Sequence, residues 1–312
     1  MRNFIFVVGP TASGKSQLAL ELAERAGGVI FNCDSVQLYQ KVAIGAAKPS
    51  LEDFKRVPHY LWDVVPPPQV MTAGEYRRIF LETLETIPAD VPIFVVGGTG
   101  FYFLALEKGL FEIEEPSESE KKEIEDELAR PGGPEKLWAE LQARDPGHAQ
   151  KLHIHDTYRL GRAIEILRAN PGRTVADLFS QKQSSQGLEG SIFKLGLKWE
   201  AAPLEARIRE RTRQMLELGL IEETGALLEE NLEDWAPLKS VGYKETVQFL
   251  KGALNRSELE EQIVIATRQL AKKQRTWFQR DSSIQWWEGT DPDLVEKSWL
   301  QLSQHLKHAG PS

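Results

Sequence analysis

One eight-residue loop constrains the fold of this chain more than any other stretch. It directly follows the apolar run 4–8 and directly precedes a helical pattern over 17–23. It fits the pattern Gly-x-x-x-x-Gly-Lys-Ser, and its residues are Gly9, Pro10, Thr11, Ala12, Ser13, Gly14, Lys15 and Ser16. The backbone N–H groups of such a loop wrap a di- or triphosphate, and the positive end of the next helix points at the same anion. The sequence therefore predicts a polyphosphate site between a strand and a helix.

Two side chains at the end of this loop indicate how the phosphate is held. Lys15 can reach the terminal phosphates, and Ser16 can ligate a magnesium ion that bridges them, so we expect Mg²⁺ as the cofactor. The loop is compatible with ATP- and other nucleotide-binding enzymes and with enzymes that expel pyrophosphate. It leaves open whether the phosphate is transferred, hydrolysed or released. A chance glycine turn is the alternative, and the flanking strand and helix weigh against it.

Further candidate residues follow two other predicted strands. Asp34 comes directly after the buried run 29–33, where ligands bind in an open α/β sheet. It is a candidate general base or magnesium ligand, and a helix N-cap is the alternative. The run 92–96 leads into a second glycine loop that carries Thr99, whose hydroxyl can reach a ligand. Gln37 has an amide that could pair with an adenine edge.

The order of strand and helix patterns predicts the fold class. We expect an α/β, P-loop NTPase-like core with a parallel sheet and flanking helices, plus a helical insertion domain. The core comprises residues 1–112 and 191–312, and the insertion comprises residues 113–190. The insertion begins with a charged, acid-rich helical pattern up to residue 130 and ends in a polar loop over 181–190.

Arginines on two predicted helices are candidates for phosphate contacts. In the insertion, Arg159 and Arg162 lie three residues apart on one face, away from an apolar face. Pairing with acidic neighbours on the same helix is the alternative. In the core, Arg207 and Arg211 are four residues apart and share a face, which points either at a phosphate or at solvent.

The clearest cationic stretch lies near the C-terminal end. Residues 268–280 contain five cations and no acid, although the net charge of the chain is −8. Arg268, Lys272 and Arg275 form one stripe at helical spacing, which predicts a contact with a phosphodiester backbone. An ordinary solvated face is the alternative.

Composition and missing motifs narrow the class of protein. The one cysteine cannot form an internal disulfide, and the chain shows neither a signal peptide nor a membrane-length apolar run. We therefore expect a cytoplasmic protein without a membrane partner. The guanine-specificity motif Asn-Lys-x-Asp is absent, and no apolar strand ends in a clear Asp-Glu pair. GTPases and motor ATPases are thus disfavoured, while a small-molecule kinase stays open.

The ordered set of motifs closely resembles the tRNA dimethylallyltransferases, also called tRNA isopentenyltransferases, of the bacterial type. The matching stretches are residues 9–16, 34–39, 44–49, 58–63, 97–100, 159–165, 242–245 and 267–278. They run in the family's order from the first strand to the basic helix. Eukaryotic relatives add a zinc-finger extension, and this chain has no Cys-x-x-Cys motif.

The resemblance implies a prenyl transfer. A dimethylallyl group passes from dimethylallyl diphosphate to the N6 amine of the adenosine just 3′ of a tRNA anticodon, and pyrophosphate leaves without consumption of ATP. Asp34 would accept the proton or a hydrogen bond from the amine. The loop residues 9–16, with Lys15 and magnesium on Ser16, would stabilise the departing pyrophosphate. Thr11 and the catalytic candidate Thr99 would line the reaction channel.

The resemblance also implies how the substrates are bound. Arg207 or Arg211 would neutralise the pyrophosphate, and the sequence leaves open which of them does so. The turn formed by Asp34, Ser35, Val36 and Gln37 would read the target base. The insertion would clasp the anticodon stem with Arg159 and Arg162, and Arg268, Lys272 and Arg275 would contact the tRNA backbone.

The chain departs from the family pattern at several positions, and three alternatives remain. Ala46 stands where the family commonly has Thr, and Tyr158 stands where it usually has Gln. The alternatives are an adenylate isopentenyltransferase acting on free AMP, ADP or ATP, a P-loop kinase, and a non-catalytic RNA-binding protein. The basic helix and the insertion favour a large RNA substrate. We expect a monomer.

Overall fold

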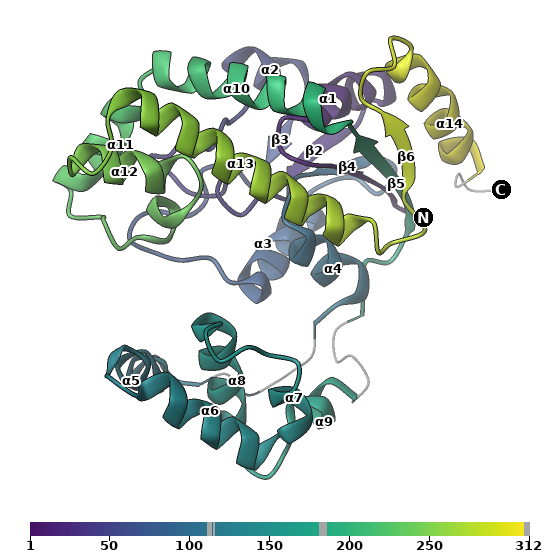
Figure 1. Ribbon diagram of the computed structural model, residues 1–312. Coiled ribbons are helices and arrows are strands. Elements are labelled where there is room, and N and C mark those ends of the chain that lie inside the picture. The colour runs from purple at the N-terminus through teal and green to yellow at the C-terminus, as the bar shows by residue number, and fades with distance from the viewer. Residues whose placement is uncertain (111–113, 115, 181–185, 309–312) are drawn as a thin grey trace. The chain divides into compact units, whose positions relative to one another are not determined.

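The chain divides into two compact units in the computed structural model (Figure 1). The structure describes residues 1–110, 114, 116–180 and 186–308. The first unit comprises Met1–Leu106 and Glu189–Ser312, and the second comprises Glu107–Leu188. The sequence-based boundaries lie a few residues later, at 112/113 and 190/191. Residues 112 and 113 are outside the described part of the chain.

The first unit is built on a six-stranded parallel sheet with the order β3-β2-β4-β1-β5-β6. The strands are β1 (Asn3–Val8), β2 (Val29–Asn32), β3 (His59–Tyr60), β4 (Ile93–Val96), β5 (Ser191–Lys198) and β6 (Gln285–Glu288). Parallel strands end at the same edge, so the segments that follow β1, β2 and β4 lie next to one another. This is the α/β, P-loop NTPase-like core that the sequence predicts.

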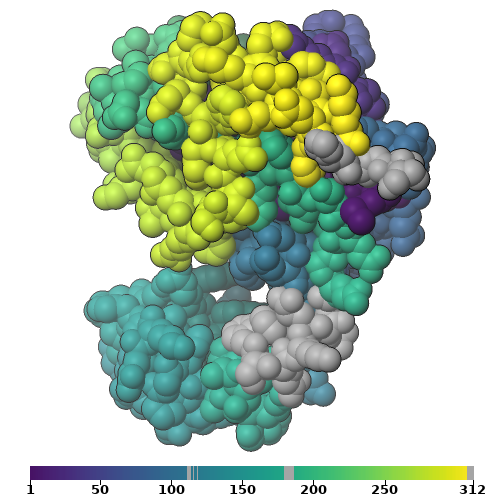
Figure 2. Space-filling view, turned by 90° about the vertical axis from the view of Figure 1, so that its right-hand side faces the viewer, coloured from purple at the N-terminus to yellow at the C-terminus, as the bar shows by residue number. Residues whose placement is uncertain are grey.

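Different helices cover the two faces of the sheet. Helices α1 (Lys15–Ala26) and α14 (Leu294–His308) pack on one face, where Leu302 joins a buried cluster with Ile5 and Val7. Figure 2 shows α14 in yellow on the surface. Helices α3 (Ala73–Glu85) and α4 (Gly100–Lys108) cover the other face, where the rings of Phe6 and Phe103 lie 5.1 Å apart. Burial on both faces explains why the strands are continuous apolar runs.

The remaining helices of this unit follow the strands or complete the edge of the sheet. They are α2 (Leu51–Arg56), α10 (Ala201–Glu217), α11 (Leu220–Glu229), the 3-10 helix η1 (Ala236–Lys239), α12 (Tyr243–Leu250) and α13 (Arg256–Phe278). Helices α10 and α13 lie side by side (Figure 1). The side chain of Asn255 caps α13 by accepting the N–H groups of Ser257 and Glu258. Helix α13 contains residues 268–278 of the cationic stretch, so it is the predicted basic helix.

The second unit is a group of helices with its own apolar core. Its helices are α5 (Glu118–Ala129), α6 (Gly133–Arg144), α7 (Pro146–Ala149), α8 (Thr157–Ala169) and α9 (Val175–Ser180). Leu137, Leu141 and Leu160 are fully buried in it. Arg168 forms ion pairs with Glu127 at 2.8 Å and with Glu140 at 2.7 Å. In the polar loop predicted over 181–190, residues 181–185 lie outside the described part of the chain.

Candidate active site

The phosphate loop joins β1 to α1 in the conformation that its glycines allow. Gly14 has φ +89°, which an L side chain rarely adopts, and it caps α1. A Cβ atom on Gly9 would lie 3.1 Å from the carbonyl oxygen of Leu197. The pKa of Lys15 is lowered to about 8, mainly by burial; Asp34 opposes this effect and Arg211 adds to it. The loop thus holds a cation that has little solvation of its own and gains most from an anionic ligand.

Arg207 supports the loop from outside. Its Nε donates to the carbonyl oxygen of Ala12 at 2.8 Å, and its guanidinium lies 4.8 Å from the centroid of the Trp199 ring. The indole N–H of Trp199 in turn donates to the carbonyl oxygen of Ser13 at 3.0 Å. Arg207 and Trp199 therefore fix the backbone of the loop, so that its N–H groups can face a ligand.

Arg211 lies on the inner side of the loop. Its Nη1 donates to the Thr11 hydroxyl at 3.4 Å. Burial lowers the pKa of Arg211, and the carboxylate of Asp34 opposes that effect. Arg211 and Arg207 share a helix face, but only Arg211 lines a cavity together with Lys15 and Asp34. The structure thus separates the two arginines that the sequence left as equal candidates.

Asp34 lies two residues after the end of β2, and its two carboxylate oxygens are in different environments. Oδ1 accepts the backbone N–H groups of Val36 at 2.9 Å and Gln37 at 3.4 Å, as in a local cap. The N–H of Asp34 donates to the side chain of Asn32 at 3.0 Å. Oδ2 accepts no hydrogen bond within the described part of the chain. Asp34 therefore caps the following turn with Oδ1, as in the predicted alternative, and keeps Oδ2 available for a ligand.

Thr99 joins the second glycine loop to the turn after Asp34. Its hydroxyl accepts the backbone N–H of Ser35 at 2.9 Å and donates to the Ser35 hydroxyl at 3.2 Å. A Cβ atom on Gly97 would lie 2.0 Å from the carbonyl oxygen of Cys33. Only glycine permits this approach of the two loops. In this arrangement Thr99 holds Ser35, and a direct catalytic role for Thr99 stays a prediction.

The amide of Gln37 is engaged within the protein. Its Nε2 donates to the carbonyl oxygens of Ala46 at 3.1 Å and Ala47 at 3.2 Å, and its Oε1 accepts the indole N–H of Trp62 at 3.1 Å. These contacts fasten the turn at residue 37 to the loop 43–49. The amide must break them before it can pair with an adenine edge, so base reading by this side chain stays a prediction.

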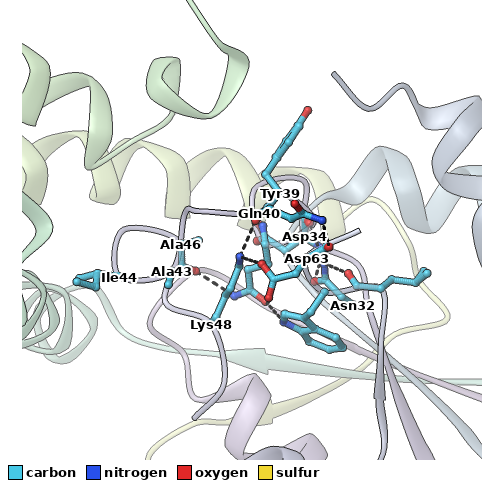
Figure 3. Close-up of polar contacts among 12 residues, drawn as sticks. Asn32, Asp34, Tyr39, Gln40, Ala43, Ile44, Ala46, Lys48 and Asp63 are labelled. Atoms are coloured by element: carbon cyan, nitrogen blue, oxygen red, sulfur yellow. Dashed lines mark hydrogen bonds and ion pairs between the residues drawn. The ribbon is translucent and has the colours of Figure 1, made fainter. Parts of the chain in front are cut away.

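Two further contacts position the loop 43–49. Lys48 donates to the carboxylate of Asp63 at 2.5 Å (Figure 3). Glu223 of α11 accepts the backbone N–H groups of residues 43–45 at distances from 2.8 to 3.2 Å and the hydroxyl of Tyr243 at 2.5 Å. Burial, and then the neighbouring Glu223, raise the pKa of Tyr243. We call Glu223 and Tyr243 the loop clamp.

Gln274 of α13 links the two glycine-containing loops. Its Oε1 accepts the N–H of Thr11 at 2.7 Å, and its Nε2 donates to the carbonyl oxygen of Gly98 at 3.2 Å. Neither the role of Gln274 nor the loop clamp was predicted from the sequence. Gln274 could have been recognised in the sequence as a polar residue on the apolar face of the basic helix. We find no local signal for Glu223, because its bonds to residues 43–45 span almost 180 positions.

Two small cavities meet at Asp34. The first, about 80 Å³, is lined by Lys15, Ser16 and Arg211 among others. The second, about 100 Å³, is the more apolar of the two, because Ile208, Met215 and Leu270 line it together with loop backbone and several hydroxyl side chains. Asp34, Thr11, Ala46 and Arg211 line both. A carboxylate thus lies where a cationic phosphate cavity adjoins an apolar one.

The basic stripe of α13 lies elsewhere. Arg268, Lys272 and Arg275 line a groove of about 590 Å³ that α13 forms with α10 and the ends of β5 and β6. Arg268 pairs with Glu205 at 3.1 Å. Lys272 and Arg275 are exposed and make no ion pair within the described ranges. Two of the three predicted phosphate contacts therefore keep an unneutralised charge.

The insertion arginines show the pairing that the sequence left as the alternative. Arg159 pairs with Asp156 at 3.0 Å, and Arg162 pairs with Glu165 at 2.8 Å. The arginine of the first pair is exposed, and such a pair contributes little stability and exchanges readily for a phosphate, whereas the second pair is half-buried. Contact of Arg159 and Arg162 with RNA stays a prediction.

The site suits a magnesium ion that is held mainly by a ligand's phosphates. No group of three or more His, Cys, Asp or Glu side chains that could hold a metal occurs among the described residues. Ser16 is an exposed residue and lines the same cavity as Lys15. Mg²⁺ commonly keeps several waters and binds through one or two protein groups plus phosphate oxygens, so a single hydroxyl fits this mode.

The fold and the site together define a class. A parallel α/β sheet carries a phosphate loop at its central strand, and an available carboxylate lies beside the phosphate cavity. This arrangement defines a P-loop transferase, an enzyme that moves either a phosphoryl group or a carbon group bound to a phosphate. The IPP transferase family model matches residues 37–281, and the chain belongs to this family.

Named relatives and solved structures agree with this family. The chain is 50% identical over 289 residues to a tRNA dimethylallyltransferase of Bdellovibrio bacteriovorus, covering 92% of this chain and 94% of that protein. It is 41% identical over 295 residues to one of Koribacter versatilis, covering 93% and 94%. A crystal structure of a tRNA isopentenylpyrophosphate transferase from Bacillus halodurans is similar with a TM-score of 0.72 at 27% identity, covering 99% and 98%.

A eukaryotic dimethylallyltransferase acting on tRNA shares the fold. Its TM-score is 0.81 at 24% identity, and the match covers 100% of this chain and 81% of the other. Across the residues that the structure describes, none of the helices is both long enough and apolar enough to span a membrane.

Proposed function

We propose that this protein transfers a dimethylallyl group from dimethylallyl diphosphate to N6 of the adenosine on the 3′ side of a tRNA anticodon. The observation that carries the proposal is the position of Asp34 between a cationic cavity and an apolar one. Lys15, Ser16 and Arg211 line the first cavity with the groups that bind a diphosphate. The second suits the planar, weakly polar groups that must meet at the carboxylate, which are the prenyl chain and the adenine.

The chemistry is a displacement at the first carbon of the donor. The N6 lone pair forms the new C–N bond while the bond from carbon to the diphosphate oxygen breaks, and pyrophosphate leaves with that electron pair. The N6 proton goes to the carboxylate of Asp34. Its hydrogen bonds from Val36 and Gln37 fix Oδ1 and leave Oδ2 for the amine. An aromatic amine is a weak nucleophile, so placement and proton removal both contribute.

Cations of the phosphate cavity stabilise the leaving group. Negative charge grows on the diphosphate as the carbon–oxygen bond breaks, and Lys15 and Arg211 lie in that cavity. Both are poorly solvated in the free protein, which makes their interaction with an anion stronger. A magnesium ion on Ser16, when bound, would neutralise further charge on the diphosphate oxygens.

The tRNA would contact both units. We propose that Arg159 and Arg162 of the helical insertion contact the anticodon stem and that Lys272 and Arg275 contact the backbone. The exposed charges of the latter pair support this assignment. Action as a monomer, and in the cytoplasm, stay predictions.

Labelled dimethylallyl diphosphate tests the proposal. The protein is incubated with the donor and either unmodified tRNA or AMP, and the nucleosides are analysed by mass spectrometry. We expect N6-dimethylallyladenosine in tRNA. Label in AMP and none in tRNA would instead identify an adenylate isopentenyltransferase.

A second arm tests the role of the carboxylate. Asp34→Asn keeps the size of the side chain and removes the base, so kcat should fall by about 10²–10⁴-fold. Affinity for tRNA should change less than about threefold. Unchanged kcat in Asp34→Asn would refute the assigned role of Asp34.

A further inference from the structure

Helix α13 has two opposite flanks on either side of its buried face. Gln274 lies on the buried face, and Arg268, Lys272 and Arg275 lie on the flank that faces the groove with α10. At 100° per residue, Lys273 and Trp277 lie on the other flank, which continues to Arg280 just beyond the helix. The cationic stripe predicted from the sequence lies on the first flank only. The second flank carries Trp277, which lies between Lys273 and Arg280 in the sequence.

An exposed apolar patch lies at this second flank. Trp277 is 40% exposed, and the first two turns of α4 add Phe101 at 48% and Leu104 at 40%. A Cβ atom on Gly100 would lie 2.1 Å from the Trp277 ring, so the indole packs directly on the start of α4. Figure 1 shows α4 beneath the C-terminal end of α13. We call Trp277, Phe101 and Leu104 the aromatic patch.

The aromatic patch is close along the chain to residues of the proposed reaction site. Thr267 and Leu270 line the second cavity at Asp34, and Leu270 lies two helical turns before Trp277 on the same face of α13. Gly98, which Gln274 contacts, is two residues before Gly100. A nucleotide that presents its base to Asp34 would therefore bring its neighbours towards this patch.

The charge around the aromatic patch is positive. Lys273 and Arg280 are exposed and form no ion pair with any residue in the described ranges. They belong to a stretch that has five cations and no acid in a chain of net charge −8. Exposed aromatic rings beside unpaired cations are the combination that binds unpaired nucleotides, because the rings stack on bases and the cations meet phosphates.

We propose that the aromatic patch is a stacking platform for unpaired RNA bases adjacent to the adenosine that enters the reaction site. The inference rests on the proposed function. Trp277 and Phe101 present ring faces to the neighbouring bases, and Lys273 and Arg280 contact the phosphates between them. The platform holds the loop open, which offsets part of the cost of unstacking the reacting base.

A double-mutant cycle tests the platform. The RNA is an anticodon stem-loop, used intact or with abasic residues on either side of the target adenosine. The variants are Trp277→Leu, which keeps apolar bulk without a ring, Trp277→Phe, which keeps a ring, and Phe101→Ala. With intact RNA we expect Trp277→Leu and Phe101→Ala to raise Kd at least about fivefold, and Trp277→Phe to raise it less. With abasic RNA these differences should disappear.

Matched controls separate stacking from other effects. Leu300 is a 60% exposed apolar residue on α14, and Leu300→Ala should leave Kd unchanged. Equal losses on intact and abasic RNA would overturn the proposal. A lower melting temperature of Trp277→Leu with unchanged RNA affinity would also overturn it, since the patch would then serve packing.

The same experiment distinguishes the two proposals. Product formation by the parent protein on intact RNA reports the proposed function alone. Binding of intact and abasic RNA reports the platform, whether or not product forms. The donor's KM should stay unchanged in Phe101→Ala, because Phe101 lines neither of the two cavities at Asp34.

Discussion

Replacing Lys15 by Met should stabilise the free protein while strongly weakening its stabilisation by diphosphate. Burial lowers the pKa of Lys15 from 10.5 to about 8. A difference of this size corresponds to about 3 kcal/mol between the charged and neutral forms. Partial exposure and lost contacts of the side chain reduce the effect, so we expect a gain in unfolding free energy of about 1–2 kcal/mol at pH 7.

The pH dependence of this gain follows from the direction of the pKa change. The pKa of Lys15 is lower in the folded chain, so the unfolded chain binds more protons between about pH 8 and 10.5. The contribution of Lys15 to the stability of the parent therefore rises with pH in that window. The variant lacks this group, so its advantage should be largest below pH 8 and should shrink above it.

Urea unfolding at pH 7 and pH 9.5 measures this effect. Lys307→Met, at an exposed lysine of α14, is the matched control and should show no such pH-dependent gain. Inorganic pyrophosphate at 100 times its Kd should stabilise the parent by about 2.7 kcal/mol and the variant by much less. A Lys15→Met variant that is less stable than the parent by the same amount at both pH values would refute the argument.

Three further predictions concern the support of the site and the second unit. Tyr243→Phe removes the hydroxyl that donates to Glu223, so urea unfolding should show a loss of about 1.5–3 kcal/mol; a loss below about 0.5 kcal/mol would contradict the clamp. Gly97→Ala places a Cβ atom 2.0 Å from a backbone carbonyl oxygen, so a loss of about 3 kcal/mol or more is expected in thermal unfolding, whereas Gly225→Ala, with open space around it, should cost nothing. Arg168 of α8 holds the pKa of Glu127 at about 2, below its usual 4.5, so the contribution of this carboxylate to stability should be lost as the pH falls from about 4.5 towards 2. Acid unfolding followed by circular dichroism measures this loss, and Glu127→Gln should lack it.

Local patterns in the sequence determined the framework of this protein. The phosphate loop could be placed because a strand, a glycine-bounded turn and a helix follow one another within about 20 residues. Asp34 and Thr99 could be assigned to one edge because parallel strands end together. The basic character of α13 could also be predicted, since charge and helical period are local properties.

Tertiary packing decided which side chains face the site. Arg207 and Arg211 have the same spacing and charge, and only the packing of α10 against the loop directs Arg211 to the cavity with Asp34. The bonds from Glu223 to residues 43–45 and from Gln274 to Thr11 connect segments about 180 and 263 positions apart. No local pattern encodes such pairs, because their geometry depends on how the helices pack on the sheet.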